Sequence, residues 1–218
     1  MTQTQDLGQR LVSLDAFRGV TIAAMILVNN PGSWDHVYAP LLHAKWHGWT
    51  PTDLVYPFFL FIVGVAMVFS FGKQLQSKSK SDVYWKVLKR AVLIFLIGLF
   101  LNLLPNFDFA TLRVAGVLQR IAIVYGVASL IVLNTGIFGQ AITAVGLLLG
   151  YWIALMWVPV PGHGAGVLTP EANLAAYIDS LLLPGRMWQG TWDPEGILST
   201  IPAVSTTLFG VLAGHGLR

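Results

Sequence analysis

Apolar residues gather in six long runs that are separated by polar segments. The runs cover residues 11–28, 54–71, 92–104, 114–133, 141–158 and 198–213. A membrane-spanning helix needs about 20 mostly apolar residues, and most of the runs come near that length. Because backbone polar groups cannot stay unpaired in lipid, each run is predicted to be a helix. The pattern therefore predicts an all-α, polytopic membrane protein with about six transmembrane helices.

The positions of lysine and arginine predict how these helices are oriented. Cytoplasmic loops carry an excess of both residues, so the basic segment 73–90 is predicted to be cytoplasmic, and with it the N-terminus and Arg10. The segments 31–52, 105–113 and 159–196 then lie outside, each with a single lysine or arginine. Six tryptophans fall on that outer side, where an interfacial belt is expected: Trp34, Trp46, Trp49, Trp157, Trp188 and Trp192. We predict a multi-pass protein of the inner (plasma) membrane.

Composition supports the membrane class and excludes several others. Of 218 residues, 55% are hydrophobic and 11% are charged, whereas soluble domains carry about 25% charged residues. The chain has no cysteine, which excludes disulfides, thiolate metal sites and a thiol nucleophile. The net charge of +3 comes largely from the segment 73–90, so we expect the bilayer as a partner and no nucleic acid. Two Gly-x-x-x-Gly patterns, at Gly146/Gly150 and Gly210/Gly214, fit close helix packing and permit a homodimer.

The polar loop before the second run carries the strongest candidate chemistry. His43 and His47 are four residues apart, and Asp35 and Asp53 could add carboxylate ligands, but the H-E-x-x-H pattern is absent and we predict no metal site. The histidines could instead be polar groups at the membrane interface. Alternatively, one of them is a general base or nucleophile whose ring is oriented by Asp53.

Charged residues inside the predicted spans are the second set of candidates. Asp15 and Arg18 share a helical face, either as an ion pair or with Arg18 meeting an anionic ligand at the inner mouth. Gln119 and Arg120 lie in the outer half of the fourth run. Unpaired in lipid, Arg120 would cost about 2.5 kcal/mol or more, so it faces an internal acid such as Asp53, or water, or a ligand.

Five ordered segments resemble the heparan-α-glucosaminide N-acetyltransferase family. They are S-L-D-A-F-R-G from Ser13, the H-A-x-W-x-G-x-T-x-x-D-L-V-x-P-F block from His43, R-V-x-G-V-L-Q-R-I-A from Arg113, N-L-A-A-Y-I-D from Asn173 and W-D-P-E-G-I-L-S-T from Trp192. Taken alone, the last segment is typical of a helix N-terminus. Family members are longer and have more spans, so we expect 1–218 to be a single transmembrane acyltransferase domain that lacks the family's C-terminal spans.

The resemblance implies an enzyme that takes an acetyl group from cytoplasmic acetyl-CoA, as co-substrate, and delivers it to an amino sugar across the membrane. It implies that His43 is catalytic, supported by Asp53 and Asn29, and that His47 is less important. Arg18, Gln119 and Arg120 are expected to bind the donor. Two other readings stay open: a transporter or channel subunit that uses the intramembrane charges as a path, and a packing subunit without chemistry.

Overall fold

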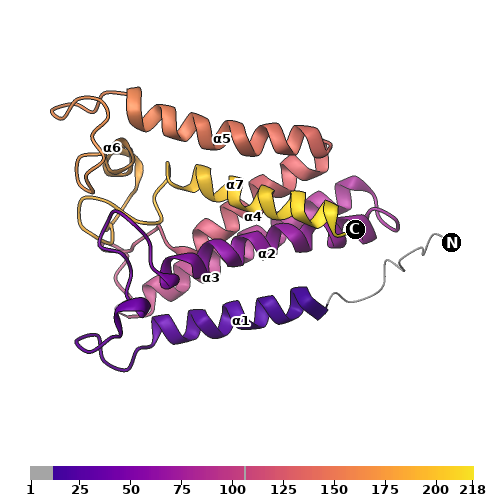
Figure 1. Cartoon of the computed structure of the whole chain (residues 1–218), viewed down its shortest axis with the longest axis horizontal. Helices are drawn as coiled ribbons and strands as arrows, with labels where there is room; N and C mark the ends of the chain where they lie inside the picture. The colour runs from indigo at the N-terminus through magenta and orange to yellow at the C-terminus, as the bar shows by residue number, and fades with distance from the viewer. Residues whose placement is uncertain (1–11, 106) are drawn as a thin grey trace.

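The part of the chain that the computed structural model describes, residues 12–105 and 107–218, consists of helices and connecting loops (Figure 1). The helices are α1 (Val12–Asn29), the short 3₁₀ helix η1 (Ala39–Leu41), α2 (Pro51–Gln74), α3 (Lys80–Leu103), α4 (Val117–Asn134), α5 (Ile137–Trp157), α6 (Leu174–Leu182) and α7 (Thr200–Gly216). These residues form no strand, only isolated bridges between Arg113 and Gly185 and between Val160 and Gly164. The all-α prediction is confirmed. Arg10 and Leu11 lie outside the described residues.

The long helices run back and forth between two ends of the molecule. The connections 30–50, 107–116 and 158–199 gather at one end, at the left of Figure 1, and we call this the loop end. The turns 75–79 and 135–136 lie at the opposite end together with the C-terminus, and we call this the turn end. This alternation matches the order of sides that the sequence predicts, and it places the predicted outer loops together.

Four of the described helices are long and apolar enough to cross a membrane: α1, α2, α4 and α5. The other two predicted runs also lie in helices, namely α3 and α7. Helix α7 has only 17 residues, and the first half of α3 carries lysines and an arginine. That α3 and α7 also cross the membrane, which would make six spans, therefore stays a prediction.

Two polar segments contain helix that the apolar pattern did not predict. The segment 73–90 was expected to be a loop, but α3 already begins at Lys80 because Ser79 and Asp82 form a capping box, with the Ser79 hydroxyl 2.7 Å from Asp82 Oδ2. Val83 and Val87 are buried on the inner face of this polar first half. In the segment 159–196, α6 begins where Asn173 accepts a hydrogen bond from the N–H of Ala176 at 2.9 Å.

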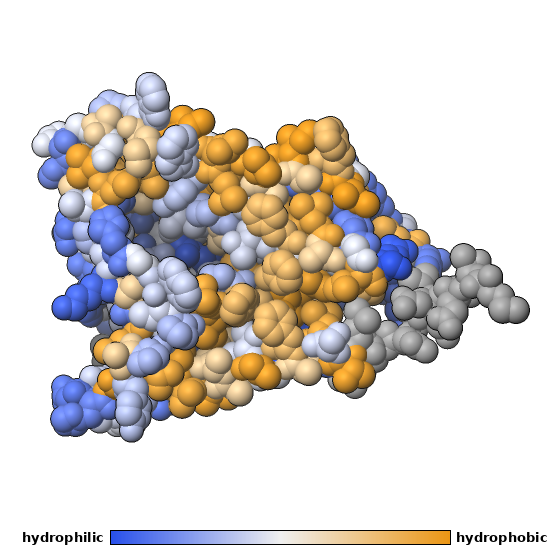
Figure 2. Space-filling model, in the orientation of Figure 1, coloured by the Kyte–Doolittle hydropathy of each residue, from blue (hydrophilic) through white to orange (hydrophobic). Residues whose placement is uncertain are grey.

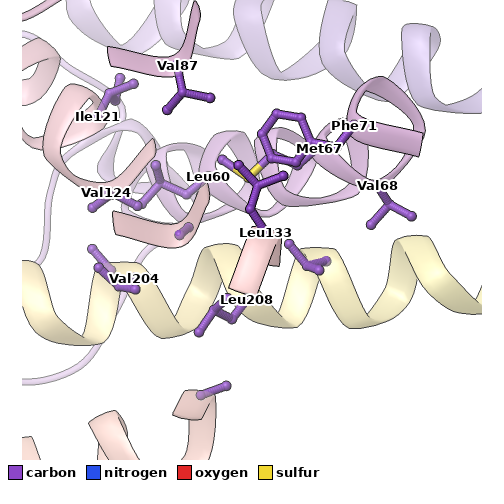
Figure 3. Packing of buried hydrophobic residues seen from close by; sticks show 14 of the residues in the cluster. Leu60, Met67, Val68, Phe71, Val87, Ile121, Val124, Leu133, Val204 and Leu208 are labelled. Atoms are coloured by element: carbon purple, nitrogen blue, oxygen red, sulfur yellow. The ribbon is translucent and has the colours of Figure 1, made fainter. Parts of the chain in front are cut away.

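The core lies where α2 and α7 meet α3 and α4 (Figure 3). Leu60, Met67 and Phe71 of α2 pack with Val124 of α4 and Leu208 of α7, and all five are almost fully buried. On the outside of the molecule, exposed apolar side chains cover the flanks of the helices, and hydrophilic residues cover the loop end (Figure 2). Such a wide exposed apolar belt is expected of a surface that faces lipid or further helices.

Glycines set the close approach of α2 and α7. A Cβ on Gly210 would overlap the carbonyl oxygen of Phe61, and a Cβ on Gly64 would overlap that of Thr207. A Cβ on Gly214 would lie 3.1 Å from the Val65 carbonyl oxygen. The Gly210/Gly214 pattern therefore does serve close helix packing. The Gly146/Gly150 pattern does not do so here, since a Cβ at either position of α5 would meet open space among the described residues.

We expect Gly210→Ala to destabilise the fold. The added methyl forces α2 and α7 apart, and overpacking of this kind costs about 1–3 kcal/mol, more than the gain of up to about 1 kcal/mol that alanine brings to a helix. Thermal unfolding in detergent measures the effect. Gly146→Ala is the matched control and should leave the melting temperature unchanged or raise it; equal melting temperatures for the two variants would contradict this account of the α2–α7 contact.

Candidate functional site

The first turn of α2 is built around the carboxylate of Asp53. Thr50 is the N-cap, Pro51 occupies the first helical position and Asp53 the third, which makes a capping box. Oδ2 of Asp53 accepts hydrogen bonds from the N–H of Thr50 at 2.8 Å, from the Thr50 hydroxyl at 3.1 Å and from the N–H of Ala44 at 3.1 Å. The helix start and the loop before it thus fix the position of this carboxylate.

The other oxygen of the same carboxylate meets His43. Oδ1 of Asp53 lies 2.6 Å from Nδ1 of His43. A carboxylate against Nδ1 favours the tautomer with its proton on that nitrogen, which leaves the lone pair of Nε2 to accept a proton or to attack a carbonyl carbon. The His43 side chain is 69% exposed, so its ring is accessible at the loop end. The structure brings these two predicted residues together, and their catalytic role stays a prediction.

Trp46 joins the His43 loop to the long connection 158–199 at two points. Its indole Nε1 donates to the carbonyl oxygen of Leu168 at 2.6 Å. Its ring packs edge-on against that of Trp192, with the centroids 5.1 Å apart. Edge-to-face pairs of this kind contribute about 0.5–1.5 kcal/mol beyond the buried area. Four other tryptophans of the predicted interfacial belt are well exposed: Trp34, Trp49, Trp157 and Trp188.

A buried ion pair anchors the loop that carries Trp192. Nε of Arg113 donates to Oδ2 of Asp193 at 2.7 Å and Nη2 donates to Oδ1 at 2.5 Å, while Nη2 also donates to Glu195. The Asp193 side chain is fully buried. Paired forks of this type are the strongest carboxylate contacts of arginine. Next to the pair, Gly185 (φ +78°) lets the backbone approach so closely that a Cβ would overlap the carbonyl oxygen of Leu112.

The surroundings of Asp193 change its acidity. Burial alone would raise the pKa of Asp193, but the hydrogen bonds from Arg113 and from the N–H groups of Trp188 and Glu195 outweigh it and hold the pKa below its ordinary value of 3.8. The opposite balance holds for Asp179 of α6, where burial raises the pKa above 3.8 despite a hydrogen bond from the N–H of Ile197. Asp193 is therefore held as a carboxylate beside Arg113.

Arg120 reaches the same loop from α4. Its Nη2 donates to the carbonyl oxygen of Pro194 at 2.7 Å and to the hydroxyl of Ser199. These oxygens are neutral, so Arg120 is not held by Asp53, whose oxygens are occupied by the helix cap and His43. Nε of Arg120 is buried and has no hydrogen-bond partner among the described residues. The guanidinium thus keeps one donor for another group.

Gln119 points in a different direction from its neighbour. Its side chain is buried against α3, where a Cβ on Gly98 would lie 2.6 Å from Oε1, and against Gly116 at the start of α4. Its amide Nε2 is buried and has no partner within the described part of the chain. Gln119 and Arg120 therefore do not present one shared face, although each offers an unused N–H.

The two remaining predicted residues lie on α1. Asn29, the last residue of α1, donates its amide to the carbonyl oxygen of Met25 at 2.9 Å, so the structure places it at the loop end with its side chain bonded to its own helix. Arg18 lies 3.3 Å from Asp15, which is the ion pair that the sequence allowed. Arg18 precedes Asn29 by 11 positions, or roughly 16 Å of helix, so Arg18 lies in the half of α1 nearer the turn end.

Among the described residues, no three histidine, aspartate or glutamate side chains lie close enough together to hold a metal ion. His47 lies beside the ring of Trp46, with centroids 6.5 Å apart.

Sequence reasoning missed the pair of Arg113 and Asp193. The segment from Trp192 was interpreted as a signal that precedes a helix, and α7 does follow it from Thr200, but the role of Asp193 is to turn back to Arg113. One signal was available, because Arg113 is the single basic residue of its predicted outer loop and the acidic residues Asp193 and Glu195 lie on the same predicted side.

Together these features define a helical membrane protein with a histidine–carboxylate pair at one end of its bundle. The chain belongs to the heparan-α-glucosaminide N-acetyltransferase family, whose catalytic region matches residues 10–217. It is 31% identical over 259 aligned residues to heparan-α-glucosaminide N-acetyltransferase of Homo sapiens and 30% identical over 257 to that of Mus musculus. These alignments cover 95% and 94% of this chain but only 38% of each relative. The family resemblance predicted from the sequence is confirmed.

We expect Asp193→Asn to destabilise the protein by about 3 kcal/mol, because it leaves the half-buried Arg113 without its main counter-charge. The wild-type pKa of Asp193 is lowered, so the stabilisation is complete above pH 3.8 and is lost as the pH falls through the lower folded-state value. The gap in unfolding temperature between wild type and variant should stay constant from about pH 8 to 5 and close only in stronger acid. Arg186→Gln, an exposed control, should show no gap; a gap that closes near neutral pH would refute the assignment.

Proposed function

We propose that the chain, as one transmembrane domain, transfers an acetyl group from cytoplasmic acetyl-CoA to an amino sugar of the glucosamine type on the extracytoplasmic side. The contact that carries this proposal is Nδ1 of His43 at 2.6 Å from Asp53, on an accessible loop end. Membership in a family of N-acetyltransferases supports the reaction type. The names of the two relatives support an amino-sugar acceptor.

His43 supplies the proton transfer or the nucleophile. In direct transfer, the acceptor nitrogen bonds the acetyl carbonyl carbon while Nε2 of His43 takes the amine proton; the carbon–sulfur bond breaks and the proton passes to the thiolate. In the two-step route, Nε2 bonds the carbonyl carbon first and the thiolate leaves. The acceptor amine then displaces the imidazole, and its proton passes through the freed Nε2 to the thiolate. Asp53 stabilises the positive imidazole ring in either route.

The other predicted residues are proposed to hold the donor. Asn29 and Gln119 are amides that would donate to the thioester oxygen as negative charge builds on it, and the unpartnered buried Nε2 of Gln119 supports this role. Arg120 and Arg18 would meet phosphate or pantetheine oxygens of acetyl-CoA. The buried Nε of Arg120 has no hydrogen-bond partner among the described residues, which supports a donor-binding role for Arg120. The position of Arg18 in the half of α1 nearer the turn end supports the same role for Arg18.

The proposed membrane topology completes the reaction scheme. Helices α3 and α7 are taken as spans together with the four apolar helices, with the N-terminus and turn end in the cytoplasm of a plasma-membrane protein. The lysine-rich start of α3 supports this orientation. Helix α7 is short, at roughly 26 Å, but it is buried between α2 and α5 in the bundle.

We expect His43→Ala to lower acetyl transfer by at least about 100-fold, because the proton acceptor or nucleophile is lost. Asp53→Asn should also lower the rate strongly, since an amide favours the wrong ring tautomer. Transfer of labelled acetyl from acetyl-CoA to glucosamine by the wild-type chain and its variants in membranes measures both. His47→Ala should stay active; activity that survives in His43→Ala and vanishes in His47→Ala would overturn the assignment.

Labelled acetyl-CoA without acceptor separates the two routes, because only the two-step route leaves label on His43. A wild-type chain that is folded and neither binds CoA nor transfers acetyl would refute the proposed function itself.

The chain contains no cysteine, so single cysteines report its topology. In intact cells, Ser33→Cys in the first long loop should react with a membrane-impermeant maleimide, and Ser77→Cys in the turn between α2 and α3 should react only after the membrane is opened. Both positions are exposed, so accessibility within the fold does not confuse the result. The reverse pattern would place the loop end in the cytoplasm and contradict the orientation.

A further inference from the structure

An apolar groove lies between the first half of α3 and the second half of α4, away from the histidine site. It has a volume of about 540 Å³ and is lined by Ser81, Tyr84, Trp85, Val87, Leu88, Ala91, Gly126 and Leu130. The groove exists because small residues face each other at its deep end, where a Cβ on Gly126 would meet only the Cβ of Ala91, at 3.9 Å. A volume of this size is typical of a ligand site.

A basic pocket runs beside this groove along α3, starting at the Ser81 end, which we call the mouth of the groove. Lys78, Asp82, Trp85, Lys86 and Lys89 line it, so Trp85 belongs to both the groove and the pocket. The ammonium of Lys89 lies 5.1 Å from the centroid of the Trp85 ring. Asp82 is occupied by the capping box, where it accepts from the Ser79 hydroxyl. Three lysines therefore face a pocket whose single acid is already bonded.

The neighbouring cations are engaged elsewhere, which singles out these three lysines. Lys80 donates to Oδ1 of Asn134 at 3.1 Å, and the guanidinium of Arg90 lies 5.5 Å from the centroid of the Tyr125 ring. The Lys80–Asn134 bond also shows that the mouth lies at the turn end. Trp85 is 58% exposed there, as is usual for tryptophan at a membrane interface.

The basic pocket reaches from Lys78 to Lys89 and therefore lies beside the groove over nearly the same stretch of α3. From Ser81 to Ala91, α3 advances by roughly 15 Å, which is long enough for part of an acyl chain. An acyl chain fits such a groove with its head group at the basic pocket. Lysine-rich pockets at the ends of spans are a recurring arrangement for anionic lipid head groups.

We propose that this groove and pocket bind one anionic phospholipid, with an acyl chain along α3 and α4 and its phosphate at Lys78, Lys86 and Lys89. The assignment does not depend on acetyl transfer. It makes the polar start of α3 a lipid site in the leaflet that meets the turn end.

Two kinds of variant test the two halves of the site. Lys86→Gln with Lys89→Gln removes two cations and should weaken phosphatidylglycerol about 30-fold while leaving phosphatidylcholine unaffected. Gly126→Leu fills the deep end and should reduce retention of both lipids, since the chain path is blocked while the Cβ itself fits. Native mass spectrometry of the detergent-solubilised full chain, titrated with each lipid, counts the bound molecules.

Matched controls come from the same chain. Lys45→Gln with Arg186→Gln removes two cations at the loop end, and Gly146→Leu adds the same side chain to an open face of α5; neither should change lipid retention. Phosphatidylglycerol binding that is unchanged in both test variants would overturn the proposal. So would displacement of the lipid by CoA or by glycerophosphoglycerol, because either result would show a site for a soluble phosphate.

Discussion

A single carboxylate links the helix at the centre of the fold to the histidine at its end. Asp53 uses one oxygen to cap α2 and to hold the N–H of Ala44, and the other to meet Nδ1 of His43. Helix α2 packs in turn against α1, α4 and α7. The position of His43 is therefore set by a helix that packs inside the bundle, although the residue itself belongs to an exposed loop. Sites that rest on rigid elements in this way keep their geometry better than sites held by loops alone.

The loop end is held together by contacts between segments that are far apart in sequence. Arg113 binds Asp193, Arg120 binds the following carbonyl oxygens, and Trp192 on the same loop packs against Trp46 beside His43. The Arg120 contact joins the start of α4 to this connection, and the other two contacts join it to the segments before α4 and α2. A chain of contacts thus runs from Arg113 through the loop of Asp193 and Trp192 to Trp46, which follows His43 by three residues.

The sequence predicted the parts of this structure that depend on local pattern. Apolar runs located the long helices, and the ten-residue spacing of His43 and Asp53 made their contact plausible because both flank one helix start. The start of α3 was missed because its signal is a polar capping box, which an apolar pattern does not see. The pair of Arg113 and Asp193 is 80 residues apart, and nothing local selects one acid among several. Likewise, Gly210 and Gly146 sit in the same five-residue pattern, and only the tertiary contact with Phe61 tells them apart.

The proposed reaction requires a donor that reaches from one end of the bundle toward the other. Arg18 lies in the half of α1 nearer the turn end and Asn29 at the loop end, and roughly 16 Å of α1 separates them. Thr21 is the only buried residue of α1 within its described range, so this helix is far less enclosed than α2. A long, flexible thioester lying beside α1 could keep its phosphates near Arg18 and bring its carbonyl carbon toward Asn29 and His43. Under the proposed reaction, the loose packing of α1 against the bundle would leave a path for the donor along its side, which a tightly packed helix would close.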